Sequence, residues 1–172
     1  MIQLTKKKVA ELPAITTDSK IEEVAIGKVK LWKNNPRRND RAVPKLAEII
    51  KARGQITPIV VWRKNMTAYK GNTTLKACKL LEYKTIKVLF ADFPSEQSAI
   101  AYGIADNKSS EFSAWDDSIL EGMLAIENIS MFSGFDQIEQ NLLIKRMVTN
   151  KEKDLTDGLE TKNCCPKCGF EF

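Results

Sequence analysis

Residues 54–77 decide the fold, and they read GQITPIVVWRKNMTAYKGNTTLKA. The β-branched run over residues 59–63 predicts a strand, and residues 67–70 follow a short polar turn as its hairpin partner. Gly71 then leads from the second strand into a helix with one apolar face. That face contains Leu75, Cys78 and Leu81. A hairpin that runs through a glycine into a helix indicates a fold in which strands and helices pack together.

The neighbouring segments extend this unit into a small mixed sheet with flanking helices. Apolar positions at helical spacing predict a helix over residues 43–53, which Gly54 ends. A strand follows at residues 85–91, and Ser95 is placed to cap the N-terminus of another helix. Residues 21–31 alternate between apolar and polar side chains, as an edge strand does. The predicted fold class is therefore α+β.

The composition along the chain divides it into five parts. Lysines and a polar run at the N-terminus predict a tail, and a polar stretch near the C-terminus with only two leucines predicts a linker. The predicted parts are an N-terminal tail (1–20), an α+β domain (21–113), a helical extension (114–148), a linker (149–163) and a short tail with cysteines (164–172).

The overall composition is that of a soluble globular chain. Of the 172 residues, 43% are hydrophobic and 28% are charged. The longest apolar run, residues 58–62, is far shorter than the roughly 20 residues of a membrane span. No signal peptide is visible, and four cysteines without an export signal favour a reducing, cytoplasmic location. Histidine is absent, which excludes Ser-His-Asp and Cys-His catalysis and histidine metal ligands.

The net charge of +5 hides a strong asymmetry along the chain. Residues 28–87 contain sixteen Lys and Arg against three acids, an excess of 13 positive charges. Residues 114–149 contain two bases and six acids. The basic half suggests a polyanionic partner such as DNA or a nucleotide, whereas a merely solvated lysine face is the alternative.

The turn at Gly71 is the clearest candidate for an anion site. A glycine between a strand and a helix lets the backbone approach a ligand closely, and the helix N-terminus offers free amides that favour a phosphate. Asn72, Thr73 and Thr74 add further donors. A glycine-led helix start is also common as a plain turn.

Three segments in combination resemble the ParB/sulfiredoxin superfamily, and within it the ParB-like N-terminal domain. They are Gly54-Gln55 before Pro58-Ile59-Val60-Val61, then Gly71 to Ala77, and then Asp106-Asn107. Upstream, Asn35-Pro36-Arg37-Arg38 is similar to the Asn-Pro-Arg loop of this family. The resemblance covers about residues 21–147. The stretches after Asp106 look most like a phage and mobile-element branch, whose members often lead DNA methyltransferases.

The resemblance implies a nucleoside triphosphate bound with Mg²⁺, and a role in DNA metabolism. The implied nucleotide-binding residues are Gly54, Gln55, Gly71, Asn72, Thr73, Thr74, Asp106, Asn107 and Lys108. Asp106 stands where the family has a glutamate and is the candidate catalytic, ion-holding acid. The implied contacts to DNA or nucleotide phosphate are Arg37, Arg38, Lys70 and Lys76.

The departures from the family pattern leave the activity open. Asn72-Thr73-Thr74 stand where the family has Glu-Arg-Arg, and Ser110 stands near the place of another missing arginine. These losses weaken triphosphate binding unless Lys70, Lys76 or Lys108 substitutes. Three functions therefore stay open: a DNA-binding protein with a nucleotide cleft, a metal-dependent nuclease or NTPase, and a non-catalytic adaptor for a DNA methyltransferase or packaging enzyme. Sulfiredoxin activity is excluded because the glycine box holds no cysteine, and Cys78 is expected in the core.

The predicted helical extension has the wrong charge for a DNA-reading element. Its acidic residues oppose phosphate contact, so it caps the domain or binds a partner. Capping boxes are predicted at residues 113–116 and 136–139. Trp115, Phe132 and Phe135 are expected to anchor its core.

The last cysteines have the spacing of a zinc knuckle. Cys165 and Cys168 flank a tight turn, and Cys164 is a possible third ligand. Because no second pair and no histidine exist, a zinc ion needs further ligands. Either two chains each give Cys165 and Cys168, which predicts a homodimer bridged by zinc, or Cys164 joins as third ligand and a partner's side chain is the fourth. A tail with free thiols is the alternative.

Overall fold

The computed structural model describes residues 14–127 and 129–156. It contains two compact units, Met1–Ala114 and Trp115–Phe172, and each is described by itself. The predicted zinc ligands Cys164, Cys165 and Cys168 lie outside the described residues.

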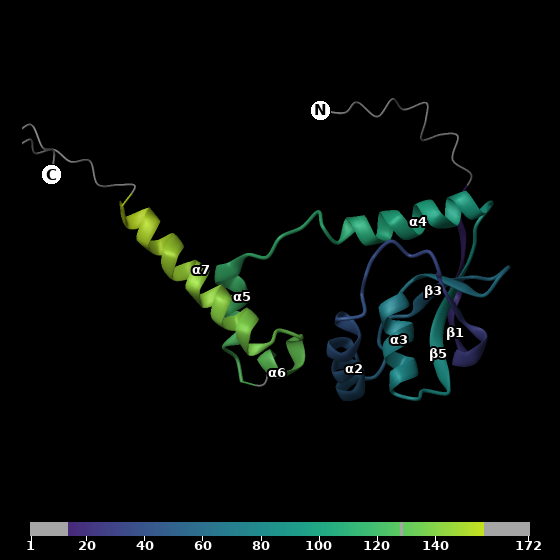
Figure 1. The fold of residues 1–172 in the computed structure, drawn as a ribbon, viewed down its shortest axis with the longest axis horizontal. Helices are drawn as coiled ribbons and strands as arrows, with labels where there is room; N and C mark the ends of the chain where they lie inside the picture. The colour runs from purple at the N-terminus through teal and green to yellow at the C-terminus, as the bar shows by residue number, and fades with distance from the viewer. Residues whose placement is uncertain (1–13, 128, 157–172) are drawn as a thin grey trace, which may run out of the picture. The chain divides into compact units, whose positions relative to one another are not determined.

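The first unit is built on one mixed five-stranded sheet (Figure 1). Its strands are β1 (Thr16–Ala25), β2 (Lys30–Leu31), β3 (Ile59–Trp62), β4 (Thr67–Lys70) and β5 (Thr85–Asp92). They lie in the order β1-β5-β3-β4-β2. Two strand pairs are antiparallel, β1 with β5 and β3 with β4, and two are parallel, β3 with β5 and β2 with β4. The predicted α+β fold with a small mixed sheet is confirmed.

The described residues of this unit form three α-helices: α2 (Ala42–Arg53), α3 (Asn72–Leu80) and α4 (Glu96–Ser109). In Figure 1, α2 and α3 lie side by side on the sheet. Successive side chains of β3 enter different clusters, because neighbouring residues of a strand face opposite sides. Ile59 and Val61 belong to the larger cluster, which also contains α2 and α3 residues, and Val60 and Trp62 to an aromatic cluster beside α4. Cys78 is fully buried in the larger cluster, as predicted.

One glycine sets the distance between α4 and the sheet. A Cβ at Gly103 would lie 2.7 Å from the Trp32 ring and 3.1 Å from the carbonyl oxygen of Tyr69. Only a glycine lets the helix backbone approach these groups so closely. This contact holds the middle of α4 close to β4, and it thereby positions the last turn of the helix.

The predicted single strand over residues 21–31 is wrong in one respect. A 3-10 turn, η1 (Ile26–Lys28), divides it, so that β1 and β2 lie at opposite edges of the sheet. In addition, β1 begins at Thr16, inside the predicted tail, because Thr17 pairs with Ala91 and Asp18 forms an ion pair with Arg63. These long-range contacts extend a strand that the polar local sequence does not favour.

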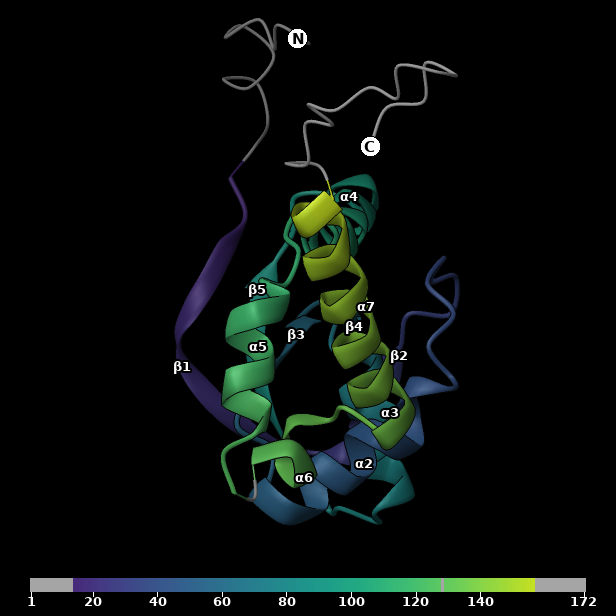
Figure 2. The same cartoon turned by 90° about the vertical axis from the view of Figure 1, so that its left-hand side faces the viewer.

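The second unit contains α5 (Asp117–Leu124), α6 (Ile129–Ser133) and α7 (Gln137–Thr156), with α5 beside α7 (Figure 2). Asp136 and Glu139 form the predicted capping box, since each backbone amide donates to the other carboxylate at 2.9 Å. At α5 the predicted box is wrong, because Asp116 itself is the N-cap. The predicted linker is also wrong in part, since its Lys- and Glu-rich start continues α7 to Thr156.

The core of the helical unit is small. Leu120 and Leu143 are its buried side chains among the residues whose burial is described. Trp115, expected as a core anchor, is 70% exposed. Its ring nevertheless packs against that of the half-buried Phe135, with 5.8 Å between the ring centroids. It precedes the N-cap of α5, outside the helix pair. The side chain of Phe132 lies outside the description.

Candidate functional site

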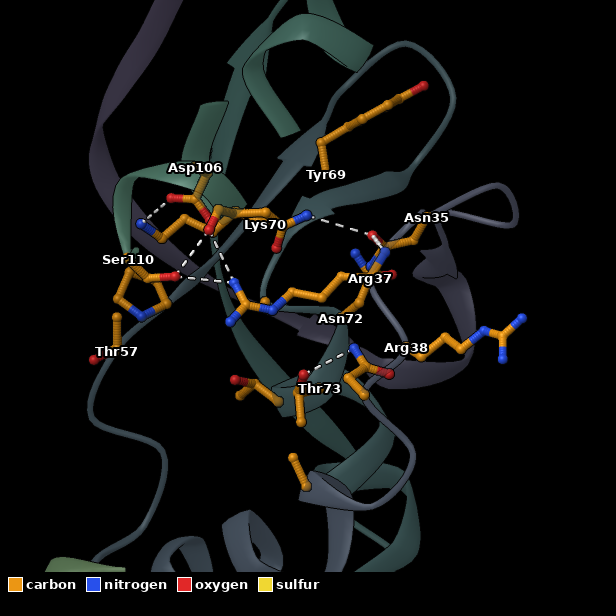
Figure 3. A pocket seen from close by; sticks show the side chains of 16 residues that line it. Asn35, Arg37, Arg38, Thr57, Tyr69, Lys70, Asn72, Thr73, Asp106 and Ser110 are labelled. Atoms are coloured by element: carbon orange, nitrogen blue, oxygen red, sulfur yellow. Dashed lines mark hydrogen bonds and ion pairs between the residues drawn. The ribbon is translucent and has the colours of Figure 1, made fainter. Parts of the chain in front are cut away.

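Three segments that are distant in the sequence form most of the lining of one cleft in the first unit. They are the loop between β2 and α2, the junction of β4 with α3, and the last turn of α4. The cleft has a volume of about 510 Å³ (Figure 3). Its polar and charged lining residues are Asn35, Arg37, Arg38, Asn39, Thr57, Tyr69, Lys70, Asn72, Thr73, Thr74, Asp106, Asn107 and Ser110. The fold therefore brings together most residues that the sequence selects.

The first wall is the start of α3. Gly71 is the N-cap in a left-handed conformation with φ of 85°, and a Cβ there would clash with the Ile59 side chain. The first amides of α3, up to Thr74, have no acceptor within the helix, since the helical ladder begins with the amide of Leu75 donating to Gly71. This wall presents backbone donors and the positive end of the helix dipole.

Asn72 contributes to this wall in a way that the sequence does not reveal. Its side chain is buried, and its Oδ1 accepts a hydrogen bond from the Trp32 amide at 2.9 Å. Its Nδ2 donates to the carbonyl oxygen of Ala68, also at 2.9 Å. The side chain thus ties α3 to β2 and β4. What Asn72 offers to a ligand is its backbone amide.

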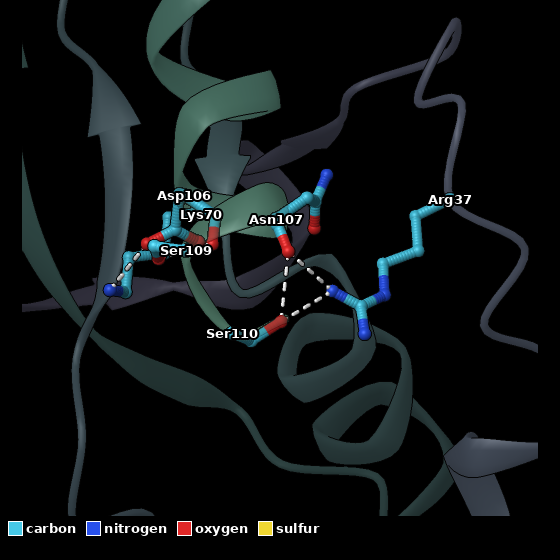
Figure 4. A network of polar contacts seen from close by, with 6 residues as sticks. All are labelled: Arg37, Lys70, Asp106, Asn107, Ser109 and Ser110. Atoms are coloured by element: carbon cyan, nitrogen blue, oxygen red, sulfur yellow. Dashed lines mark hydrogen bonds and ion pairs between the residues drawn. The ribbon is translucent and has the colours of Figure 1, made fainter. Parts of the chain in front are cut away.

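The second wall is the loop that carries Arg37. The Arg37 Nη1 donates to the Asn107 carbonyl oxygen and to the Ser110 Oγ, each at 2.9 Å (Figure 4). A guanidinium suits this place because the carbonyls at a helix C-terminus carry partial negative charge. On the other side of the loop, Asn39 Nδ2 donates to Thr73 Oγ1 at 2.8 Å. The loop therefore connects the end of α4 with the start of α3.

An ion pair closes the third side. Lys70 Nζ lies 2.7 Å from Asp106 Oδ1, with both side chains in the cleft lining (Figure 4). The hydrogen bond that Lys70 donates to Asp106 raises the pKa of Lys70 above its ordinary value, and partial burial opposes this effect. Lys70 is thus charged at neutral pH. Beside this pair, Asn107 Nδ2 lies 3.4 Å from Asn35 Oδ1.

Four selected residues lie outside the lining of this cleft. Gln55 is buried, accepts from the Lys87 amide at 2.7 Å and donates to the Lys87 carbonyl at 2.9 Å, so it ties the end of α2 to β5. Gly54 ends α2 with φ of 73°. Lys76 pairs with Asp40 at 2.6 Å, and Lys108 pairs with Glu111 at 2.5 Å, which lowers the pKa of Glu111.

The oxygen ligands of the cleft suit a magnesium ion only when phosphates supply further ligands. Asp106 is the one carboxylate of the cleft lining, and Asn107 adds an amide oxygen. Mg²⁺ is typically bound through one or two carboxylates, with substrate phosphates and water completing the octahedron. No group of three or more acidic or cysteine side chains able to hold a metal occurs in the described part of the chain.

Two residues of the site carry no selecting pattern in the sequence. Asn39 follows the Asn-Pro-Arg-Arg loop, and its contact with Thr73 depends on how that loop folds back. Ser110 stands near the expected place of an arginine, and its hydroxyl instead joins Arg37 to the end of α4. Side chains of this size are common in loops, so only the three-dimensional arrangement selects them.

The sheet, the glycine-led helix and the polar cleft define an α+β domain whose cleft presents donors suited to an anion. Residues 11–107 match the family of the ParB N-terminal domain. The chain belongs to this family, as its motifs indicate. No curated protein matches the sequence.

Several solved structures are similar to this chain, and the first one named here shares its fold. The C-terminally truncated chromosome-partitioning protein ParB from Caulobacter crescentus, complexed with CTP-gamma-S, is 16% identical, with a TM-score of 0.63 over 81% of this chain and 86% of that one. A Pnob8-like ParB-N domain is 21% identical, with a TM-score of 0.42 over 88% of this chain and 52% of that one. The Caulobacter protein complexed to the centromeric parS site is 15% identical, with a TM-score of 0.41 over 80% and 78%.

Among the helices of the described residues, none combines the length and the apolar character needed to cross a bilayer.

Proposed function

We propose that this chain binds a nucleoside triphosphate in the cleft and DNA on the adjoining basic surface. The observation that carries the first part is the convergence of three kinds of hydrogen-bond donor that can bind a phosphate. The α3 amides, Lys70 and Arg37 meet around one cavity of about 510 Å³. A cavity of this size suits a small polar ligand. A ParB of the same fold is complexed with CTP-gamma-S, which supports a nucleotide as the ligand.

Each group has a role in this proposal. The backbone at Gly71, Thr73 and Thr74 holds phosphate oxygens, as helix N-termini do. Arg37 adds a fork of donors suited to phosphate. Asn107 and Asp106 hold the Mg²⁺ that accompanies the phosphates. Replacing the family arginines by threonines favours binding over hydrolysis, because less positive charge faces the transition state.

The nucleotide part is tested by calorimetry with CTP, ATP and GTP in the presence of Mg²⁺. We expect micromolar binding of one of them, and a loss of at least about tenfold in Asn107→Ala. Asn34→Ala is the matched control, because Asn34 lies outside the cleft lining. If wild-type protein binds none of the three nucleotides, this part of the proposal is wrong.

The DNA part rests on a second basic cavity beside the first. It has a volume of about 540 Å³ and is lined by Lys33, Arg37, Arg38 and Lys76, with Asp40 as its acid. Figure 3 shows Arg38 pointing away from Arg37 and the cleft centre. No acidic partner of Arg38 is found among the described residues. A side chain so placed is free to contact a phosphate of a polynucleotide.

Salt dependence tests this surface directly. Each phosphate contact contributes about 0.9 to the slope of log K against log salt concentration. We therefore expect Arg38→Ala to lower the slope for duplex DNA by about one unit. An unchanged slope would remove Arg38 from the interface. The expected phage or mobile-element process, the cytoplasmic location and the zinc-bridged dimer remain predictions.

The adaptor function has one observation in its favour. In the helical unit, α5 exposes Ile119 and Met123 one turn apart, and α7 exposes Ile138 and Leu142 at the same spacing. Exposed apolar side chains at helical spacing are typical of surfaces that bind a partner. A DNA-modifying or packaging enzyme is the proposed partner, and the adaptor alone predicts no nucleotide affinity. The nuclease or NTPase alternative requires Mg²⁺-dependent turnover that Asp106→Ala abolishes.

A further inference from the structure

The ion pair of Lys70 and Asp106 is the one pairing of opposite charges inside the cleft lining. Lys70 is the last residue of β4, directly before the glycine that starts the α3 wall. Asp106 lies on the last turns of α4. The Lys70 side chain is 40% exposed and the Asp106 side chain 25% exposed, so a ligand in the cleft reaches both groups.

The cations of the cleft differ in what holds them. Arg37 donates to a neutral carbonyl and a hydroxyl at the end of α4, and Arg38 points away from the centre (Figure 3). Lys70 alone is held by a full negative charge within the lining. A phosphate that approaches the α3 amides therefore meets a cation already neutralised, and next to it a carboxylate that repels it.

We infer that Lys70 is the exchangeable phosphate-binding cation of the cleft and that Asp106 is the counterion that holds it in the absence of ligand. A phosphate oxygen replaces the Asp106 carboxylate at Lys70 Nζ. The released carboxylate then either remains as an unfavourable neighbour or accepts a Mg²⁺ that arrives with the phosphates. This inference deepens the proposed nucleotide function and rests on it.

The inference predicts that removing the Asp106 charge increases the affinity for a metal-free triphosphate. A role as metal ligand alone does not predict this increase. For a triphosphate without metal, Asp106 only competes with the ligand, so its removal must tighten binding. If Asp106 were solely a ligand for Mg²⁺, Asp106→Asn would leave metal-free binding unchanged. If the ion pair only supported the fold, neutralising either partner would weaken binding alike.

The experiment measures binding of inorganic triphosphate, and of the best nucleotide, by calorimetry in EDTA. We expect Asp106→Asn to bind at least about fivefold tighter than wild type, because it frees Lys70 and removes a like charge. Lys70→Gln should bind about tenfold more weakly, and Lys70→Arg should retain most of the affinity. Asp92→Asn is the matched control, because Asp92 pairs with Arg63 at 3.7 Å and neither residue lines the cleft or the second basic cavity. It should change the affinity by less than about twofold.

The outcomes separate this inference from the proposed function. If wild type binds a nucleotide but Asp106→Asn does not bind triphosphate more tightly, the inference is wrong and the nucleotide function stands. If wild type binds nothing but Asp106→Asn binds triphosphate, the counterion role is supported and the nucleotide function is not. If neither protein binds, both are wrong. A circular-dichroism melt confirms that each variant is folded.

Discussion

The two main walls of the cleft are held in different ways. The α3 wall continues the core, since Leu75, Ala77 and Cys78 are fully buried and Asn72 is 6% exposed. The loop wall is held by hydrogen bonds of Arg37, which lies at the surface. The α3 amides are therefore held in place by the same packing that stabilises the fold. The cation on the loop can exchange its partners at small cost in stability.

The largest expected effect is at the start of the α3 wall. Gly71→Ala should lower the free energy of unfolding by about 3 kcal/mol, because it adds a left-handed alanine and a clash with Ile59. The measurement is urea unfolding followed by circular dichroism. The sharpest control is Gly71→Asn, because asparagine tolerates the left-handed region better than alanine but adds the same Cβ beside Ile59.

The control isolates the packing contribution. Gly71→Asn should still cost about 2 kcal/mol, because the clash with Ile59 remains when the backbone strain is reduced. A loss near zero in Gly71→Asn would mean that Ile59 moves aside without cost. The α3 wall would then be held no more firmly than the loop wall.

The second effect separates two asparagines, one on each wall. Asn72→Ala should cost about 2 kcal/mol, because it leaves the Trp32 amide and the Ala68 carbonyl buried without a partner. Asn35→Ala, on the loop wall, should cost less than about 0.5 kcal/mol, since its contacts are exposed or long. Thermal melts of the two variants measure the difference. A loss at Asn35 as large as that at Asn72 would contradict the distinction.

The third prediction concerns binding, where we expect a substitution on the loop wall to have a large effect although its effect on stability is small. Arg37→Ala should reduce stability by less than about 1 kcal/mol, since its hydrogen bonds are exposed. It should weaken nucleotide binding about tenfold, because a charged donor is lost. Calorimetry and a melt on the same sample give both values. A large loss of stability with unchanged affinity would show that Arg37 belongs to the fold alone.

Much of the fold was predictable because local rules decide it. The hairpin of β3 and β4, the glycine before α3 and the Ser95 cap follow from residue types at fixed spacing. The division of residues 21–31 between two sheet edges was not predictable, because it depends on the pairing of β1 with β5. The same holds for the start of β1 at Thr16, which the contact of Asp18 with Arg63 supports.

The site was predictable as a set of segments, and less so as a set of side-chain contacts. The order of the motifs selected Arg37, Gly71 and Asp106, and the fold brings them to one cleft. It could not reveal that the side chains of Gln55 and Asn72 bond to backbone groups inside the domain. Polar side chains in a motif look alike in sequence, whether they face a ligand or hold the backbone that does.

The smallest effect tests whether the two walls influence each other. Asn39 Nδ2 donates to Thr73 Oγ1, and Asn39 Oδ1 accepts from Lys76 at 3.1 Å, so this side chain joins the loop to α3. Asn39→Ala should cost about 0.5 kcal/mol of stability, because water replaces partly exposed bonds. It should weaken nucleotide binding only about threefold, through a less ordered Arg37 loop.

Thr73→Val is the matched control, since it removes the same hydrogen bond from the α3 side and keeps the shape of the side chain. If the contact orders the loop, the double variant should bind no more weakly than Asn39→Ala alone, because both changes remove one interaction. Additive losses would mean that Asn39 and Thr73 meet the ligand separately. The two walls would then act independently, and the loop would recognise the ligand without help from α3.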